Sequence, residues 1–312
     1  MAGPNNFLVI IGAPKSGTTT LAALLDQHPA IVLGSEKEPR FFTDFVESPW
    51  TGPGSEGFLR TLVSEEAAYL SLFADKEKPD AAWAIDASTD YLWCDAAPDR
   101  IAAWARRFPT KVICILRDPV ERAISEYQHT LRDGYEDRDL ITALDLEAER
   151  MANHWPPLFY HLRRSSYSAP LARYRQLFRD DLLVLGFHEL RDPVRVTQRV
   201  MQFLDLPDAA IEPGVHLNTS YVYRNETAAR LMTSGNLRNL ARRIVPKGVR
   251  STVRKMLLPA LTQPYAASPA DLARLDRDLG DEIRTCRDNP EIPTGGWRSI
   301  ERLDGARQVH EA

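Results

Sequence analysis

The stretch FLVIIGAPKSGTTT at residues 7–20 joins an apolar run to a glycine-containing loop and the start of a helix. Residues 7–12 are apolar, partly β-branched and end in glycine, which is typical of a strand buried on both faces of a parallel sheet. Leucines with helical spacing follow at Leu21, Leu24 and Leu25. The stretch therefore predicts a strand, a loop and a helix in direct succession.

The same order of elements recurs further along the chain. Three later apolar runs are typical of strands: WAIDAS at 83–88, KVICIL at 111–116 and LLVLGF at 182–187. After the second run, Asp118 is the expected N-cap of a helix, Pro119 its first residue and Gly134 its end, and another helix should follow Asp192 and Pro193. Alternating strands and helices predict an α/β fold with a mainly parallel central sheet flanked by helices, a three-layer sandwich that binds ligands beyond the carboxyl ends of its strands.

The composition excludes several classes of protein. A hydrophobic fraction of 44% and a charged fraction of 26% are typical of a globular protein and not of a disordered or fibrous chain. The net charge of −4 and the pI near 6.0 give no general attraction to nucleic acid or to an anionic membrane. We therefore expect no nucleic-acid partner, and any anion must be bound by locally placed groups.

The cysteines and the apolar runs bear on the compartment. Cys94, Cys114 and Cys286 are far apart and odd in number, which disfavours a disulfide framework and a zinc site. The apolar run at 7–11 is far shorter than the roughly 20 residues that span a bilayer, and no secretory signal precedes it. We expect a cytoplasmic protein without a transmembrane segment.

The loop at 12–19 has the features of an anion site. A loop between a buried strand and a helix N-terminus directs free N–H groups and the positive end of the helix dipole at one point. Gly12 permits the tight exit from the strand, Gly17 lets the backbone approach a ligand, and Lys15 supplies the one full charge. A plain strand-to-helix turn is the alternative, but a lysine, a serine, a glycine and threonines at one helix start favour the anion site.

The position of the lysine separates this loop from a nucleoside-triphosphate loop. The form G-x-x-x-x-G-K-[ST] fits the spacing of Gly12 and Gly17, but Thr18 stands where the lysine that reaches the terminal phosphates belongs. Lys15, three residues earlier, should lie at the rim, near the bridging oxygen of a shorter diphosphate-like group. A different nucleotide is implied. A P-loop kinase or hydrolase with a shifted lysine is one alternative, and a non-catalytic binding module is another.

Two motifs resemble those of a known family. PKSGTT at 14–19 resembles the 5′-phosphosulfate loop of sulfotransferases that use 3′-phosphoadenosine 5′-phosphosulfate (PAPS), and LRDPVERAISEY at 116–127 resembles their 3′-phosphate motif. KEPRFF at 37–42 and YSAPLARYRQLF at 167–178 are similar to the heparan-sulfate-type and bacterial branches. The resemblance implies a P-loop-NTPase-like fold with PAPS as donor. The implied contacts to the 5′ group are Pro14, Lys15, Ser16, Gly17, Thr18 and Thr19.

PAPS requires a second anion site for its 3′-phosphate. Arg117, at the end of a predicted strand, offers a planar fork for this phosphate, and Ser125, two helical turns on, offers a hydroxyl. Taken alone, the motif could be only a helix cap with an internal pair between Arg122 and Glu126. Because sulfate carries fewer charges than a terminal phosphate, and because no acidic strand end that would hold magnesium is evident, we expect no metal.

A sulfuryl transfer also needs a base for the acceptor. Glu38 occupies the position of the catalytic glutamate in the resembling heparan-type enzymes, and Lys37 beside it could contact the sulfuryl oxygens or the acceptor. A surface carboxylate, or a partner for Arg40, is the alternative for Glu38. His129 is the second candidate base, because it lies one turn after Ser125 and its YQH context is similar to the N-sulfotransferase branch; a structural histidine is the alternative.

Four further residues are weaker candidates. Asp86 and Tyr91 follow a predicted strand and either contact the acceptor or belong to the core. Tyr167 begins a helix that lies beside the nucleotide in the resembling family, although Ser166 replaces the family's preceding glycine. Heparan-type enzymes close the nucleotide site with a disulfide loop, for which this chain lacks the cysteines, so Arg224 in SYVYRNE becomes the candidate for that role.

The predicted function is transfer of a sulfuryl group from PAPS to a hydroxyl or an amine. The acceptor is a small molecule, a lipid or a glycan, and residue types alone do not choose among them or fix the oligomeric state, for which a homodimer stays open. We expect one domain over 1–312, with the donor-binding core at about 7–204 and a helical or lid region at about 205–312. There, 237–258 is basic and amphipathic, most simply a solvated helix pair, and a last helix should begin after Ser268 and continue past Ile283.

Overall fold

The core of the fold is a five-stranded sheet in which every strand pair is parallel. The computed structural model describes residues 4–47, 50–74, 78–212, 222–223, 262–263 and 265–311. The strand order is β2-β3-β1-β4-β5. Their bounds are Asn6–Gly12 for β1, Ile31–Leu33 for β2, Trp83–Asp86 for β3, Thr110–Leu116 for β4 and Leu182–Gly186 for β5. The four predicted strands and the parallel sheet are confirmed, and β2 is an additional short strand.

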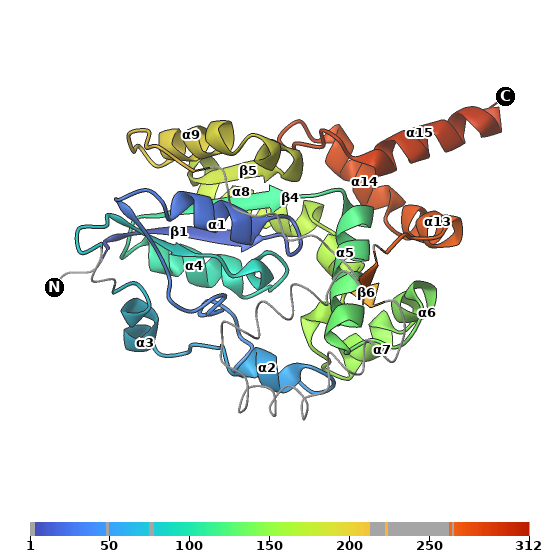
Figure 1. Cartoon of the computed structure of the whole chain (residues 1–312), viewed down its shortest axis with the longest axis horizontal. Coiled ribbons are helices and arrows are strands. Elements are labelled where there is room, and N and C mark those ends of the chain that lie inside the picture. The colour runs from blue at the N-terminus through green and yellow to red at the C-terminus, as the bar shows by residue number, and fades with distance from the viewer. Residues whose placement is uncertain are drawn as a thin grey trace.

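Side chains of β1 alternate between the two faces of the sheet. Phe7, Val9 and Ile11 are fully buried in one apolar cluster, and Leu8 and Ile10 are fully buried in another. Helices α4 and α8 contribute to the first cluster, and α1 and α9 contribute to the second, so helices cover both faces (Figure 1). These helices are α1 Thr18–Leu25, α4 Ala97–Ala105, α8 Ser168–Phe178 and α9 Pro193–Phe203. The predicted three-layer sandwich is thereby confirmed.

Helix α5 (Pro119–Asp133) stands beyond the tip of β1 in Figure 1. Its ends form as the sequence predicts: the Asp118 carboxylate accepts hydrogen bonds from Val120 N and Glu121 N, and Gly134 ends the helix in the left-handed conformation with a φ of 76°. The other Asp118 oxygen accepts a hydrogen bond from Ser299 N at 2.9 Å. One carboxylate therefore joins the helix that carries the second motif to the C-terminal part of the chain.

The C-terminal helices correct one expectation. Ser268 caps a helix as predicted, but this helix, α13 (Pro269–Asp278), ends before Gly280, and α14 (Gly280–Asp288) and α15 (Arg298–Glu311) follow. Glycine has low helical propensity, and the preceding Leu279 departs from helical backbone angles, so the apolar spacing that suggested one helix runs across two. Leu275, Leu279 and Ile283 still share one buried cluster with α5.

The remaining elements are short. They are α2 Ser55–Leu59, α3 Glu66–Ser71, α6 Leu140–Asp145, α7 Glu147–Ala152, the antiparallel pair β6 Val222–Tyr223 and β7 Thr262–Gln263, and the 3-10 turns η1 Thr89–Leu92, η2 Pro157–Phe159, η3 Arg163–Ser165, η4 Arg179–Asp181 and η5 Phe187–Arg191. In the part of the chain that the structure describes, no helix is both long and apolar enough to cross a membrane. The basic segment 237–258 and Arg224 lie outside the described residues.

Truncation of a central β1 side chain should destabilise the fold. Ile10 is fully buried and pairs in register with Ile113 of β4, so Ile10→Ala leaves a cavity in the second apolar cluster. We expect it to lower the free energy of unfolding by about 2–5 kcal/mol, measured by urea denaturation. Val194→Ala is the matched control, because Val194 is 48% exposed and its truncation should change stability by less than about 0.5 kcal/mol. Equal effects of the two variants would contradict the assigned core.

Candidate active site

A cleft of about 490 Å³ is lined by segments that follow all five parallel strands. The loops after β1 and β2, the turn after β3, the start and inner face of α5 after β4, and the start of η5 after β5 all contribute side chains. The chain therefore gathers its ligand-facing groups at the carboxyl edge of the sheet, as expected for this architecture. The predicted residues that line the cleft are Pro14, Lys15, Gly17, Thr18, Thr19, Lys37, Glu38, Arg117, Ser125 and His129.

The first motif forms a tight turn around the end of β1. Gly17 has a φ of 86°, and a Cβ at this position would collide with Leu190, so the turn requires glycine. Lys15 lies in the turn with a φ of 64°. Burial, followed by the charge of nearby Arg132, lowers the pKa of Lys15 to about 8. Ser16 lies behind the loop and not in the cleft, and its buried hydroxyl has no hydrogen-bond partner among the described residues.

The second motif meets the first directly. An Nη1–H of Arg117 donates a hydrogen bond to the carbonyl oxygen of Lys15 at 3.3 Å, and the Arg117 guanidinium lies 4.8 Å from the centroid of the Phe187 ring. Glu121 pairs with the same guanidinium at 3.2 Å. The two motifs predicted to bind anions, about a hundred residues apart in sequence, thus share one cleft. The internal pairing of Arg122 with Glu126 is also present, at 2.7 Å, but it accompanies the cleft-facing residues and does not replace them.

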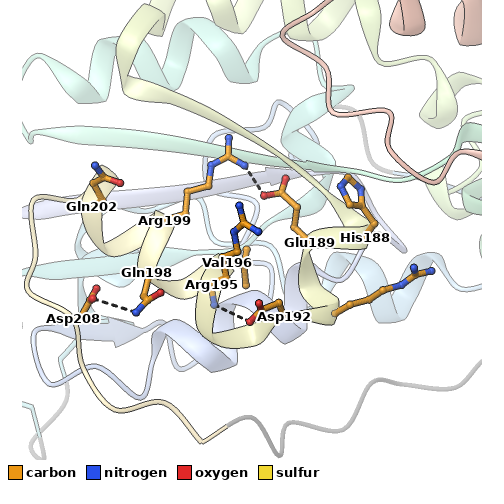
Figure 2. Close-up of a pocket in the computed structure, with 10 residues that line it drawn as sticks. His188, Glu189, Asp192, Arg195, Val196, Gln198, Arg199, Gln202 and Asp208 are labelled. Atoms are coloured by element: carbon orange, nitrogen blue, oxygen red, sulfur yellow. Dashed lines mark hydrogen bonds and ion pairs between the residues drawn. The ribbon is translucent and has the colours of Figure 1, made fainter.

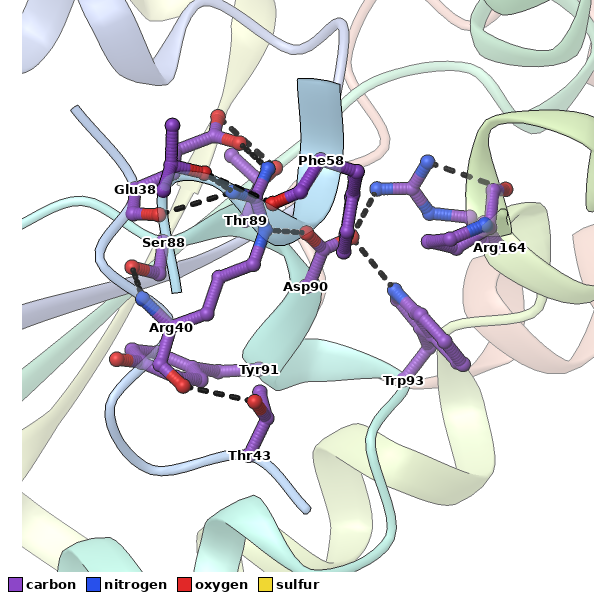
Figure 3. A network of polar contacts seen from close by, with 12 residues as sticks. Glu38, Arg40, Thr43, Phe58, Ser88, Thr89, Asp90, Tyr91, Trp93 and Arg164 are labelled. Atoms are coloured by element: carbon purple, nitrogen blue, oxygen red, sulfur yellow. Dashed lines mark hydrogen bonds and ion pairs between the residues drawn. The ribbon is translucent and has the colours of Figure 1, made fainter. Parts of the chain in front are cut away.

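Glu38 both lines the cleft and pairs with Arg40. An Arg40 Nη2–H lies against Glu38 Oε2 at 2.6 Å, and the Thr89 hydroxyl donates to Glu38 Oε1 at 3.3 Å (Figure 3). The carboxylate keeps 19% of its side-chain surface exposed, on the cleft. The alternative that Glu38 is a partner for Arg40 is therefore true, and it leaves the carboxylate accessible. Lys37 lines the same side of the cleft.

His129 lies on the cleft face of α5, one turn from Ser125. Its Nε2 lies 3.5 Å from Asp133 Oδ2. Burial, followed by the charge of Lys15, lowers the pKa of His129 to about 4, so the ring is neutral at physiological pH. Arg132 also lines the cleft, and the sequence analysis missed it although Ser125, His129 and Arg132 have the spacing of one helical face.

Other lining residues were not predicted to face the cleft. Arg40, Asp90, Glu126 and Arg164 reach the cleft through ion pairs between segments that are far apart in the chain. The apolar part of the lining was also missed, and it consists of Phe58, Leu158 and Phe187. Arg40 and Glu126 lie inside the KEPRFF and LRDPVERAISEY motifs, but there they were considered only as ion-pair partners. Asp90, Arg164 and the apolar residues carry no motif or periodicity, because tertiary packing alone brings them to the cleft.

Besides Ser16, three predicted residues do not reach the cleft. Asp86 and Tyr91 are buried, and Asp86 accepts hydrogen bonds from the hydroxyls of Tyr91 at 2.7 Å, Tyr69 at 3.0 Å and Ser88 at 2.6 Å. The alternative that they belong to the core therefore describes them, and acceptor contact is not supported. Tyr167 is the N-cap of α8 as expected, but its ring is fully buried near Trp297 and does not line the cleft.

A second hollow, of about 920 Å³, lies on the outer side of η5 and α9 and contains none of the predicted residues (Figure 2). One ion pair lies among its lining residues, with Arg199 2.5 Å from Glu189, and the Gln198 amide donates a hydrogen bond to Asp208 at 3.4 Å. Three arginines face three carboxylates there, so the hollow has no excess charge of either sign from these residues. The cleft at the strand ends, although smaller, holds most of the predicted site residues.

No set of metal ligands stands out in the described ranges: no group of three or more His, Cys, Asp and Glu residues there could hold an ion. The cations of the cleft, by contrast, can neutralise an anionic ligand directly. Lys15, Lys37, Arg117 and Arg132 all line it, and guanidinium forks and loop N–H groups are suited to phosphate and sulfate oxygens. The metal independence expected from the sequence stays a prediction.

Comparison with known proteins agrees with this geometry. A model of the sulfotransferase family matches residues 8–210. The chain is 28% identical over 206 residues to the mouse bifunctional heparan sulfate N-deacetylase/N-sulfotransferase 4, which covers 63% of this chain and 22% of that protein. It is 29% identical over 215 residues to the human heparan sulfate glucosamine 3-O-sulfotransferase 3B1, which covers 67% of this chain and 48% of that protein. The chain thus spans less than half the length of either relative.

A solved structure is similar over most of its own length. The sulfotransferase from Alicyclobacillus acidocaldarius superposes with a TM-score of 0.63 at 30% sequence identity, over 78% of this chain and 95% of that chain. The resemblance inferred from the two anion motifs is therefore confirmed. Because the family model covers more than half of the sequence, including both motifs and the loop of Glu38, the chain belongs to the sulfotransferase family.

Proposed function

We propose that the protein transfers the sulfuryl group of PAPS to a hydroxyl or an amine of an acceptor. The observation that carries the proposal is the contact of Arg117 with the Lys15 carbonyl at 3.3 Å, because it joins two anion-binding motifs at one cleft. A nucleotide with phosphate groups at both its 5′ and 3′ positions needs such a pair of sites. The loop N–H groups, Lys15 and the hydroxyls of Thr18 and Thr19 would bind the 5′-phosphosulfate, and Arg117 and Ser125 would bind the 3′-phosphate.

The reaction is an in-line displacement at sulfur. The acceptor oxygen or nitrogen forms a bond to sulfur while the bond from sulfur to the bridging oxygen breaks, and the electron pair of that bond stays with the 5′-phosphate of the leaving 3′-phosphoadenosine 5′-phosphate (PAP). By analogy with phosphoryl transfer, the transition state is loose and charge builds on the bridging oxygen. Lys15, on the turn that faces the cleft, is the group proposed to stabilise that charge.

Glu38 is the proposed base that receives the acceptor proton. Its carboxylate is partly exposed on the cleft and is held by Arg40 and Thr89. In a loose transition state the acceptor proton becomes acidic late, when a nearby carboxylate can accept it. His129 is a weaker candidate, because its low pKa and the adjacent Lys15 both oppose the charge that an accepted proton would place on the ring.

A glycan is the first acceptor class that we propose, because the two relatives are named for heparan sulfate. Lys37 and Arg132 could bind an anionic acceptor, and Phe58 and Leu158 could pack against the face of a sugar ring or against an alkyl chain. Small-molecule and lipid acceptors are the second choice. A cytoplasmic location and a homodimer stay predictions.

The donor can be tested by thermal shift. At a hundred times its dissociation constant, PAP should stabilise the protein by about 2.7 kcal/mol, because it binds only the folded state. ATP with magnesium should give a much smaller shift, since it lacks the 3′-phosphate. Adenosine is the control for binding of the base alone. A larger shift with ATP and magnesium than with PAP would favour a nucleotide kinase or hydrolase and contradict the proposal.

The affinity for PAP should depend on the protonation of Lys15. The pKa of Lys15 is lowered by burial to about 8, so its charge is present below this pH and is lost above it. We expect affinity, measured by isothermal titration calorimetry, to fall by up to about tenfold per unit as the pH rises above about 8. Lys15→Arg should remove this alkaline loss, because a guanidinium stays charged. A wild-type affinity that does not change up to about pH 9.5 would contradict the role of Lys15.

The two candidate bases can be separated by isosteric variants. Glu38→Gln should lower kcat by about 10²–10⁴-fold, as expected on loss of a general base, and leave the dissociation constant of PAP nearly unchanged. His129→Gln should lower kcat by less than about tenfold, since Glu38 and not His129 is the proposed base. Glu56→Gln is the control, because Glu56 is 93% exposed on α2. A larger effect of His129→Gln than of Glu38→Gln would reverse the assignment.

A further inference from the structure

Six charged side chains form a continuous series that begins at the partly exposed Glu38 and is otherwise buried. In order they are Glu38, Arg40, Asp90, Arg164, Glu126 and Arg122, here called the ion chain. Carboxylates and guanidinium groups alternate along it, so its three negative and three positive charges balance. Figure 3 shows the part of the ion chain around Arg40 and Asp90. The ion chain connects the loop of the proposed base to the helix of the 3′-phosphate motif.

The Arg40 guanidinium contacts both the side chain and the backbone carbonyl of Glu38. Besides the contact with Glu38 Oε2 at 2.6 Å, Arg40 Nη1 donates to the Glu38 carbonyl at 3.0 Å and to the Thr61 hydroxyl at 2.7 Å. The Phe58 ring covers the guanidinium, with its centroid 3.9 Å from Cζ. Glu38 and Arg40 both have left-handed backbone, with φ values of 57° and 54°. Residues other than glycine rarely adopt this backbone conformation, so the contacts of Arg40 are what holds the loop in place.

Asp90 and Arg164 continue the ion chain to α5. Asp90 uses one oxygen for Arg40 Nε at 2.5 Å and the other for Arg164 Nη2 at 2.6 Å. Arg164 Nη1 then pairs with Glu126 Oε1, and Glu126 Oε2 lies 2.7 Å from Arg122 Nη1. Glu126 follows Ser125 directly in α5. The carboxylate of Asp90 therefore links the loop that carries Glu38, through Arg164, to helix α5.

Because the ion chain is buried, it fixes the relative positions of its side chains more than it increases the free energy of unfolding. Arg40, Arg164 and Asp90 have exposures of 9%, 6% and 1%, so their charges have lost most of their hydration. Buried ion pairs are often no more stabilising than apolar side chains of the same size, because desolvation offsets the attraction. Planar guanidinium forks with two or more fixed partners do, however, define distances and angles closely. Such definition is what a base needs in order to meet an acceptor beside a bound donor.

We propose that Arg40, Asp90 and Arg164 are positioning residues that fix the Glu38 carboxylate relative to the donor helix α5. The inference rests on the proposed role of Glu38 as base. In the free protein the contact with Arg40 also restrains a carboxylate that would otherwise rotate freely on an open loop. Loss of Arg40, Asp90 or Arg164 should therefore reduce turnover much more than donor binding, because the groups proposed to bind PAP lie on the loop at 14–19 and at the start and on the inner face of α5.

The test compares kcat with donor affinity in two conservative variants. Arg40→Lys keeps the charge but not the fork, and Asp90→Asn keeps the shape but not the charge. Each should lower kcat by about 10²-fold, as expected from a misplacement of about 1 Å, and change the dissociation constant of PAP by less than about threefold. Arg107→Lys is the matched control, because Arg107 makes a two-bond pair with Glu66 on the exposed surface.

Chemical rescue separates positioning from general loss of structure. In Arg40→Gly, added guanidinium should restore at least part of kcat, whereas the same concentration of sodium should not, because only guanidinium can bridge Glu38 and Asp90. Unchanged kcat in Arg40→Lys and Asp90→Asn would overturn the inference. The inference would also be overturned if these variants lost kcat and PAP affinity to the same extent and guanidinium did not restore the kcat of Arg40→Gly. If wild-type protein transfers no sulfuryl group, the proposed function fails; if it does, and Glu38→Gln alone is inactive, only the positioning role fails.

Discussion

The parallel pairing of β1 with β4 is the constraint on which the cleft depends. In this register Ile10 lies opposite Ile113, so the two strands end side by side and the loop after each one emerges at the same edge of the sheet. The contact between Arg117 and the Lys15 carbonyl follows from that pairing. Gly17 allows the first loop to turn tightly against η5, and the Asp118 cap starts α5 beside it. The distance between the two motifs proposed to bind anions is therefore set by the spacing of adjacent strands.

The fold was largely predictable because its signals are local. The buried strands contain uninterrupted apolar runs at 7–11, 83–85 and 112–116, and the ends of α5 carry strong capping residues. The strand β2 escaped prediction since three residues are too few to establish a pattern. The break between α13 and α14 was missed because the leucine spacing continues across Gly280. The spacing of apolar residues thus predicts the buried face of a helix more reliably than it predicts the residue at which the helix ends.

The site was predictable only where a motif determines it. The residues of both anion motifs and of the Glu38 loop reach one cleft, because each follows a strand and local chemistry fixes its conformation. Asp86 also ends a strand, but it faces Tyr69 and Tyr91 in the interior, and only the packing of those rings decides this. Asp90 and Arg164 are 74 positions apart, so the ion chain became visible only in three dimensions. Non-local charge pairs are the main part of the site that sequence reasoning cannot supply.

The central claim is that the cleft has separate sites for a 5′ and a 3′ anion. Its most direct test is to measure, by calorimetry, the affinities of PAP and of adenosine 5′-phosphate for wild-type protein and for Arg117→Ala. The account predicts that wild type prefers PAP by about 10²-fold or more, since a paired charge-assisted contact contributes roughly 1.5–3 kcal/mol per hydrogen bond, and that Arg117→Ala removes most of this preference. Equal affinities of wild type for the two nucleotides, or a preference that survives Arg117→Ala, would contradict it.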